Sequence, residues 1–185
     1  LFIGNLLFQM KSDSNITIKE VISSDELKKF VMFPHTLYKD SKYWVAPIIK
    51  EELEVLNKET NPVFNNAIAH YFLAYIDGEI VGRIAALINW IEVKDLKKKK
   101  VRFGWFDFID DQNVSKALLE KVIEIGKKNN LEFIEGPVGF SNMDKAGMLI
   151  KGFEKKNTMI TMYNYSYYQD HMKAHGYSKL AEWVE

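Results

Sequence analysis

The fold of this chain is decided by the stretch from His70 to Ile88, which reads HYFLAYIDGEIVGRIAALI. Two apolar runs, 70–76 and 80–88, flank an Asp77-Gly78 turn. Asp-Gly between apolar runs is a strong signal for a two-residue β-hairpin, because both residues tolerate the positive φ that the turn needs. We therefore predict two antiparallel strands at this point of a sheet.

The flanking segments predict further strands and helices. Ser23 and Glu26 form a capping box that opens a helix, and Pro34 ends or kinks it. A second helix is expected with Pro47 in its first turn. The other predicted elements are strands at 16–21, 102–109 and 131–134, a helix after Asn113, a helix at 163–174, and a strand at 177–184. This order, β-α-α-β-β-β-α-β-α-β, predicts an α+β fold with a central mixed, mostly antiparallel sheet flanked by helices.

Length and composition exclude several classes of protein. The chain has 185 residues and 47% hydrophobic content, which fits a single domain. Lys+Arg and Asp+Glu each number 25, so the basic surplus typical of nucleic-acid binders is missing and no nucleic-acid partner is expected. Cysteine is absent, which excludes disulfides and thiol nucleophiles. We expect a cytoplasmic protein.

The first nine residues are apolar but lack the positive start and the cleavage site of a signal peptide. The segment 5–9 looks like the remnant of an expression tag that precedes Met10. We therefore set residues 1–9 aside and treat 10–185 as one domain. No other segment is apolar enough to span a bilayer, so we expect no membrane partner.

Several stretches carry a resemblance to a known family. They are FPHTLYK at 33–39, Asn61-Pro62, VGRIA at 81–85, Gly136-Pro137 with Phe140-Ser141, Tyr163-Asn164 with Tyr167-Tyr168, and YQDHMKAHGY at 168–177. Together with the order of the elements, they resemble the GNAT superfamily of acyl-CoA-dependent N-acyltransferases. They are most similar to an uncharacterised bacterial group of two-lobed GNAT-like proteins. The resemblance covers nearly all of 16–185 and implies a GNAT-like fold, with this chain as the N-terminal lobe.

The resemblance implies that an acyl group passes from acetyl-CoA or another acyl-CoA to the amine of a small molecule. In such proteins the pyrophosphate rests on amides at the start of the central helix, which here are those of Gln112, Asn113, Val114 and Ser115. The stretch 110–117 has no glycine, and Asp110 and Asp111 would repel an anion there. The alternative is therefore a non-catalytic GNAT-like lobe that binds a ligand or serves as a scaffold. Its partner would be a second copy or a second GNAT-like lobe.

The resemblance also implies a tyrosine that protonates the leaving thiolate, about four residues before Gly176. Met172 occupies that position, and Tyr168 lies one helical turn earlier. We take Tyr168 as the candidate acid and Asp144 as the candidate base. Asp144 lies in the loop 136–147, whose glycines suit either a capped structural turn or close approach to a ligand.

Candidate substrate-binding residues come from that loop, the tyrosine-rich segment and the hairpin. They are Gly136, Ser141, Asn142, Tyr163, Asn164, Tyr167 and Arg83. Arg83 stands in the middle of an apolar strand, so it pairs with a carboxylate such as Asp107 or Glu135, or it binds a carboxylate of the substrate. His171 and His175 have a spacing that could hold zinc, but no carboxylate completes the set and we expect no metal.

Overall fold

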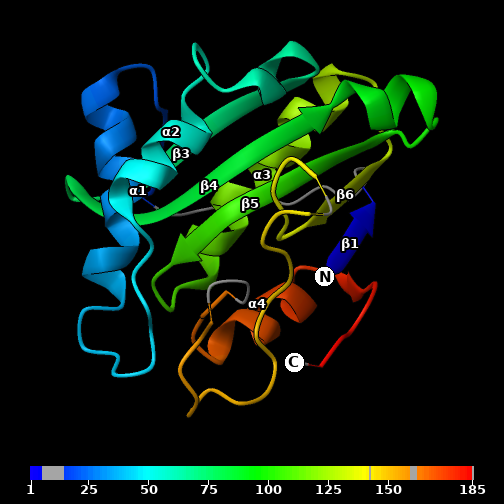
Figure 1. Ribbon diagram of the computed structural model, residues 1–185. Coiled ribbons are helices and arrows are strands. Elements are labelled where there is room, and N and C mark those ends of the chain that lie inside the picture. The colour runs from blue at the N-terminus through cyan, green and yellow to red at the C-terminus, as the bar shows by residue number, and fades with distance from the viewer. Residues whose placement is uncertain (6–14, 142, 159–161, 185) are drawn as a thin grey trace.

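The computed structural model describes residues 1–5, 15–141, 143–158 and 162–184, so the predicted site residue Asn142 lies outside the described residues. Within these described residues, seven strands in the order β2-β3-β4-β5-β6-β1-β7 form a sheet at the centre of the molecule (Figure 1). All neighbouring strands are antiparallel except β5 and β6, which are parallel. The strands are β1 (Phe2–Asn5), β2 (Thr17–Glu20), β3 (Ala67–Ile76), β4 (Glu79–Asn89), β5 (Lys100–Phe108), β6 (Phe133–Gly136) and β7 (Ser178–Lys179). The predicted α+β class and the mixed sheet are thus confirmed.

The hairpin of β3 and β4 forms as predicted. Asp77 and Gly78 have φ angles of 50° and 88°, as a type I′ turn requires, and Ile76 faces Glu79 across the turn. These two strands are the longest of the sheet. They give the helices a broad surface on which to pack.

Helices cover both faces of the sheet. The helical elements are α1 (Ser24–Leu37), α2 (Ile49–Leu56), η1 (Pro62–Asn65), η2 (Ile91–Asp95), α3 (Gln112–Lys128) and α4 (Tyr167–Ala174). Tyr71 and Leu73 of β3 belong to the core under α1 and α2, whereas Phe72 and Ala74 belong to the core under α3 and α4. This is the alternation that a strand buried on both faces must have. Within the described part of the chain, no helix has both the length and the apolar character needed to cross a bilayer.

Helix α1 passes through Pro34 and continues to Leu37, so Pro34 does not end it. The capping box opens the helix as predicted, because Ser23 Oγ accepts the Glu26 amide and Glu26 accepts the Ser23 amide. A proline in a helix leaves the carbonyl four residues earlier without its donor. Here that carbonyl belongs to Phe30, and Arg83 Nη1 donates to it at 2.9 Å.

Two terminal regions differ from the sequence-based expectation. Residues 2–5, which we had set aside, form β1 between β6 and β7, and Phe2 is buried. Helix α4 begins at Tyr167 instead of 163, because Asn164 binds the backbone of Leu149 through both ends of its amide. The last strand, predicted over 177–184, is confined to β7.

Candidate functional site

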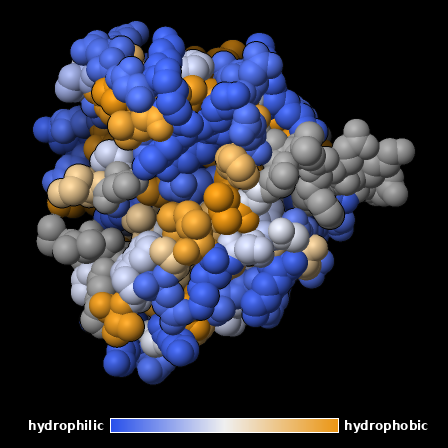
Figure 2. All heavy atoms as spheres, turned by 90° about the vertical axis from the view of Figure 1, so that its right-hand side faces the viewer, coloured by the Kyte–Doolittle hydropathy of each residue, from blue (hydrophilic) through white to orange (hydrophobic). Residues whose placement is uncertain are grey.

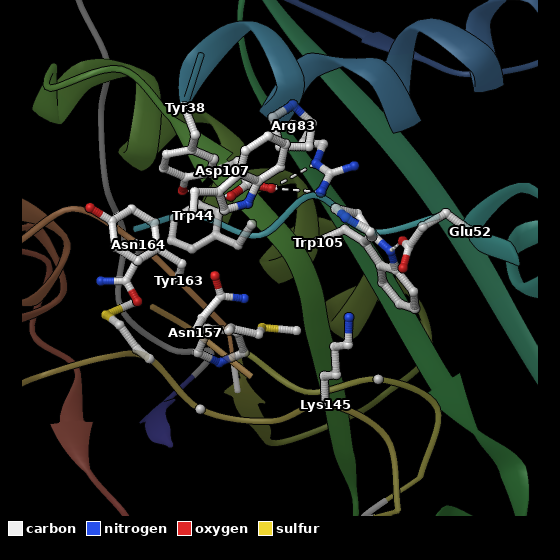
Figure 3. Close-up of a pocket in the computed structure, with 18 of the residues that line it drawn as sticks. Tyr38, Trp44, Glu52, Arg83, Trp105, Asp107, Lys145, Asn157, Tyr163 and Asn164 are labelled. Atoms are coloured by element: carbon white, nitrogen blue, oxygen red, sulfur yellow. Dashed lines mark hydrogen bonds and ion pairs between the residues drawn. The ribbon is translucent and has the colours of Figure 1, made fainter. Parts of the chain in front are cut away.

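A cavity of about 310 Å³ lies beside β5, close to the point where β5 and β6 stop pairing. The two strands pair only where Lys100–Arg102 lie beside 133–135. After β6 ends, the amide of Val138 still donates to the Phe103 carbonyl of β5, at 2.8 Å. We call residues 137–148 the site loop. This loop, β5, α2 and the segment 157–168 supply most of the lining (Figure 3).

Aromatic side chains form much of the cavity wall. Tyr38 stands at the centre of this group, with ring centroids 5.4 Å from Trp44 and 5.5 Å from Tyr163. Trp105 and Phe106 of β5 also line the cavity. Since the faces of such rings attract cations as well as apolar groups, the wall suits a ligand that carries both.

Two residues of β5 that line the cavity, Trp105 and Phe106, form a β-bulge. Gly104 faces Ala85 and Asp107 faces Arg83, so Trp105 and Phe106 together oppose the single residue between Ala85 and Arg83. Trp105 accordingly has a φ of 44°. A bulge interrupts the hydrogen-bond ladder and re-aims side chains, and bulges are frequent beside active sites.

Arg83 and Asp107 form a buried ion pair behind this bulge. Nε and Nη2 of Arg83 each lie 2.7 Å from Oδ2 of Asp107, and both residues line the cavity. Arg83 is 6% exposed and Asp107 is 9% exposed. Of the two carboxylates that the sequence suggested as partners of Arg83, the structure has Asp107, and the guanidinium is largely committed to this pair and to the Phe30 carbonyl.

A chain of hydrogen bonds joins two buried phenols to the same carboxylate. The Tyr38 hydroxyl donates to Asp107 Oδ1 at 2.8 Å, so it accepts from the Tyr168 hydroxyl 2.8 Å away. Tyr168 in turn accepts from the Phe108 amide at 3.1 Å. Burial, with the negative charge of Asp107 adding to it, raises the pKa of Tyr38 and of Tyr168 well above the ordinary value, so both phenols stay protonated.

Carboxylates surround the cavity on two sides. Glu51 and Glu52 come from α2, and Asp144 comes from the site loop. The Trp105 indole donates from Nε1 to Glu52 Oε2 at 2.7 Å, which fixes that carboxylate (Figure 3). Lys145 is the cation on the loop side and extends toward Trp105 in Figure 3. With Arg83 already paired to Asp107, the lining has an excess of negative charge.

The site loop is held by a hydrogen bond within the loop and by Arg102 of β5. Asp144 Oδ2 accepts the Ser141 amide at 2.7 Å, which is the capped turn that one interpretation of the sequence described. Gly139 lies so close that an added Cβ would be 2.5 Å from the Asp144 Cβ. Arg102 Nη1 donates to the Gly139 carbonyl, while Arg102 Nη2 pairs with the buried Glu92 at 2.7 Å. Asp144 is thus both a structural cap and a cavity residue.

The structure gathers five of the predicted site residues around the cavity. They are Asp144, Tyr168, Arg83, Tyr163 and Asn164. The other described candidates lie outside the lining. Gly136 packs against Phe103, Ser141 belongs to the loop turn, and the Tyr167 hydroxyl donates to the Phe108 carbonyl at 2.5 Å.

The predicted pyrophosphate residues, 112–115, form the first turn of α3. The Asp111 side chain caps this turn by accepting the Asn113 amide at 2.8 Å. Ser115 is fully buried, and its hydroxyl lies 2.9 Å from Nδ1 of His171 and 2.8 Å from Nε2 of His175. His171 also contacts Asp110 at 3.0 Å. Among the described residues there is no group of three potential metal ligands.

Sequence reasoning missed most of the cavity wall outside the site loop and the segment 163–168, or gave its residues other roles. Tyr38 follows the last residue of α1, Trp44 lies in the loop beyond it, and Glu52 lies in α2. All three are far along the chain from the site loop. Asp107 was considered only as a partner for Arg83. The usable signal was the density of aromatic residues in FPHTLYK and Tyr43-Trp44, since polar-tipped aromatic residues in loops often line sites.

Comparison of the structure with solved structures identifies the class of fold. A protein of Clostridium acetobutylicum, solved with acetyl-CoA and described as a predicted acetyltransferase, superposes with a TM-score of 0.57 over 92% of this chain and 94% of that one, at 13% identity. The chain therefore has the fold of the GNAT superfamily. No protein-family model matches the sequence.

Two curated proteins are similar in sequence. Protein YghO of Escherichia coli K12 is 30% identical over 172 residues, which are 91% of this chain and 44% of that protein. Bacterial ceramide synthase of Caulobacter vibrioides is 25% identical over 169 residues, again 91% of this chain and 44% of that protein. The chain thus spans less than half the length of these relatives.

Proposed function

We propose that this chain is a lobe of an N-acyltransferase that joins an acyl group from a thioester to the amine of an amphiphilic small molecule. The observation that carries the proposal is the cavity at the bulge of β5, where aromatic rings and carboxylates meet in a GNAT fold. An ammonium group is recognised by such a combination of charge and π-faces.

In this proposal the acceptor's amine lies between Glu52 and Asp144, and its apolar part follows the apolar lining residues on and just before α2. Glu52 is held by Trp105 and Asp144 by its loop, so both present fixed negative charge. Val45, Pro47 and Val55 also line the cavity, and Val45 and Val55 are 47% and 39% exposed. An alkyl chain that leaves the cavity would pack against these three side chains. A relative named ceramide synthase supports this assignment, because a ceramide is a fatty amide of a long-chain amino alcohol.

In the reaction, the nitrogen of the acceptor bonds to the acyl carbon and the carbon–sulfur bond breaks. The bound ammonium first releases one proton to solvent. The neutral amine then loses a second proton as it attacks, for which Asp144 is the proposed base, and the thiolate gains one from the acid. The bulge at Trp105 and Phe106 is the proposed site for the acyl carbonyl, since its interrupted ladder offers a backbone donor. Tyr168 is the proposed acid, because it lines the cavity and its raised pKa keeps it protonated until a basic thiolate replaces Tyr38 as its acceptor.

The first turn of α3 does not fit the pyrophosphate of coenzyme A. Asp111 already occupies the Asn113 amide, and Asp110 adds a second negative charge. This observation favours a second candidate function, in which this lobe binds the acceptor and holds it without catalysing transfer.

One experiment separates the two functions. The purified chain is incubated with palmitoyl-CoA and sphinganine, and the amide product is measured by mass spectrometry beside calorimetric titration of sphinganine alone. Amide formation that falls at least tenfold in Asp144→Asn supports the acyltransferase. Binding of the amine without product supports the acceptor-binding lobe. Neither binding nor product would overturn both.

A further inference from the structure

Lysine side chains gather at the end of the sheet where β4 passes into β5. We call this region the η2 tip; it comprises residues 90–99, the last turn of α3 at 125–128, and residues 131–133 at the entry to β6. Its exposed lysines are Lys94, Lys97, Lys98, Lys99, Lys127 and Lys128. These segments contain only two exposed carboxylates, Asp95 and Glu132. Glu132 is paired with Lys99 at 2.9 Å. The η2 tip is therefore strongly positive, although the whole chain is neutral.

Backbone hydrogen bonds bring the three segments of the η2 tip together. The Lys99 carbonyl accepts from the amides of Glu132 and Phe133, at 2.7 and 3.1 Å. The Leu131 amide donates to Gly126 at 3.0 Å, which ties the last turn of α3 to the start of β6. The lysines at the end of α3 and those of the run 97–99 thus flank one another.

Apolar side chains project among these lysines. Leu96 is 56% exposed, Ile91 is 45% exposed and Phe133 is 43% exposed. The Lys94 ammonium lies 5.1 Å from the ring centroid of Trp90. Figure 2 views the molecule from this side, and in its upper part hydrophobic residues are bordered by hydrophilic ones.

A buried ion-pair cluster holds the η2 tip in place. Glu92, at the start of η2, is 8% exposed and lies 2.7 Å from Arg102 and 3.3 Å from Lys100. The Asn89 side chain accepts the Ile91 amide at 3.0 Å. Because the base of η2 is fixed in this way, Ile91 and Leu96 are held outward at little entropic cost on binding.

We propose that the η2 tip docks on the surface of an anionic lipid bilayer. Lysines beside exposed apolar residues are the pattern of a peripheral membrane contact, in which the cations meet anionic headgroups and the apolar side chains enter the interface. Nucleic acid fits less well, because the chain's two arginines, Arg83 and Arg102, are both buried in ion pairs. The inference goes beyond the proposed function and does not depend on it, since none of the residues of the tip lines the cavity.

The test is cosedimentation of the full chain with vesicles, without any substrate. Vesicles of phosphatidylcholine and phosphatidylglycerol in equal parts should retain the chain, and vesicles of phosphatidylcholine alone should not. The retained fraction should fall as salt is raised. The double variant Lys97→Asn/Lys98→Gln should weaken the partition coefficient roughly 25-fold, at about fivefold per lysine. Asparagine is chosen at position 97 because Lys97 has a φ of 55°, a left-handed conformation that asparagine tolerates.

A matched control removes two charges elsewhere. Lys155 and Lys156 are also adjacent and exposed, so Lys155→Asn/Lys156→Gln changes the net charge equally and should leave binding within about twofold. Leu96→Ser should weaken binding to anionic vesicles by roughly tenfold. Circular dichroism verifies that each variant is folded. Equal losses in both double variants, or no binding to anionic vesicles, would overturn the proposal. So would an unchanged Leu96→Ser variant that binds an oligonucleotide as tightly as vesicles.

Discussion

Arg83 on β4 and Asp107 on β5 meet behind the bulge, with Nε and Nη2 of the arginine both 2.7 Å from one carboxylate oxygen. The same guanidinium donates to Phe30, whose carbonyl lacks its helical donor because Pro34 has no N–H. One side chain therefore joins α1, the sheet and the hydrogen-bond chain of the cavity.

Replacing Arg83 with methionine should destabilise the fold by about 3–5 kcal/mol, because Asp107 is then a buried charge without its counter-ion. The free energy of unfolding in urea measures this loss. In the double variant Arg83→Met/Asp107→Leu the charge is removed as well, so the loss should be smaller than the sum of the single losses. Strict additivity would show that the two side chains are not coupled.

Tyr168→Phe should cost about 1–3 kcal/mol, since the Phe108 amide loses its acceptor and Tyr38 loses its donor. Tyr177 is the matched control. Its hydroxyl is buried and has no hydrogen-bond partner among the described residues, so Tyr177→Phe should leave stability unchanged or raise it. Thermal unfolding compares the two variants. An equal loss in both would mean that the network around Tyr168 adds nothing to stability.

How far the sequence predicts this molecule depends on how local each signal is. The Asp77-Gly78 turn and the capping box at Ser23 form because a few neighbouring residues determine them. The partner of Arg83 was also predictable, as a buried arginine needs a carboxylate. Glu52, in contrast, lies near Trp105 only after α2 has packed on the sheet.

The ends of the chain show the same limit. The Asn164 side chain hydrogen-bonds to the backbone of Leu149, and α4 therefore begins only at Tyr167. This is a tertiary contact, which the local sequence signals for a helix do not contain. Residues 2–5 became a strand through pairing with β6 and β7, which their own composition does not specify. Of the candidate site, the loop and α4 were predicted, and the wall from α1 and α2 was not.

Stability should fall when the pH is lowered through the range of His175. Burial, followed by the charges of His171 and Lys116, lowers its pKa from 6.5 to about 4. The unfolded chain takes up a proton below pH 6.5 and the folded chain only near pH 4. The contribution is therefore fully present above pH 6.5 and is lost progressively as the pH falls to about 4, by up to about 3 kcal/mol.

Urea unfolding between pH 7.5 and 4.5 measures this dependence. His175→Gln keeps a group that can hydrogen-bond to Ser115 and cannot titrate, so its stability should vary less with pH by about one proton's slope. His70→Gln serves as the control, because it also removes one histidine, and His70 is a half-buried residue of β3 that pairs with Glu20 instead of Ser115. Parallel curves for the native chain and His175→Gln would refute the assignment to His175.

The carboxylate of Glu52 should discriminate between charged and neutral ligands of the cavity. Glutamine at this position can still accept the Trp105 indole N–H, so the wall stays in place while the negative charge is lost. We expect Glu52→Gln to weaken the binding of sphinganine roughly tenfold and to leave the binding of its neutral N-acetyl derivative within about twofold. Calorimetric titration of both ligands measures the difference. Glu54→Gln is the matched control, since Glu54 lies on the same helix, is exposed and pairs with Lys50 outside the cavity. Equal weakening for both ligands would place the amine elsewhere, and so would the same loss in Glu54→Gln.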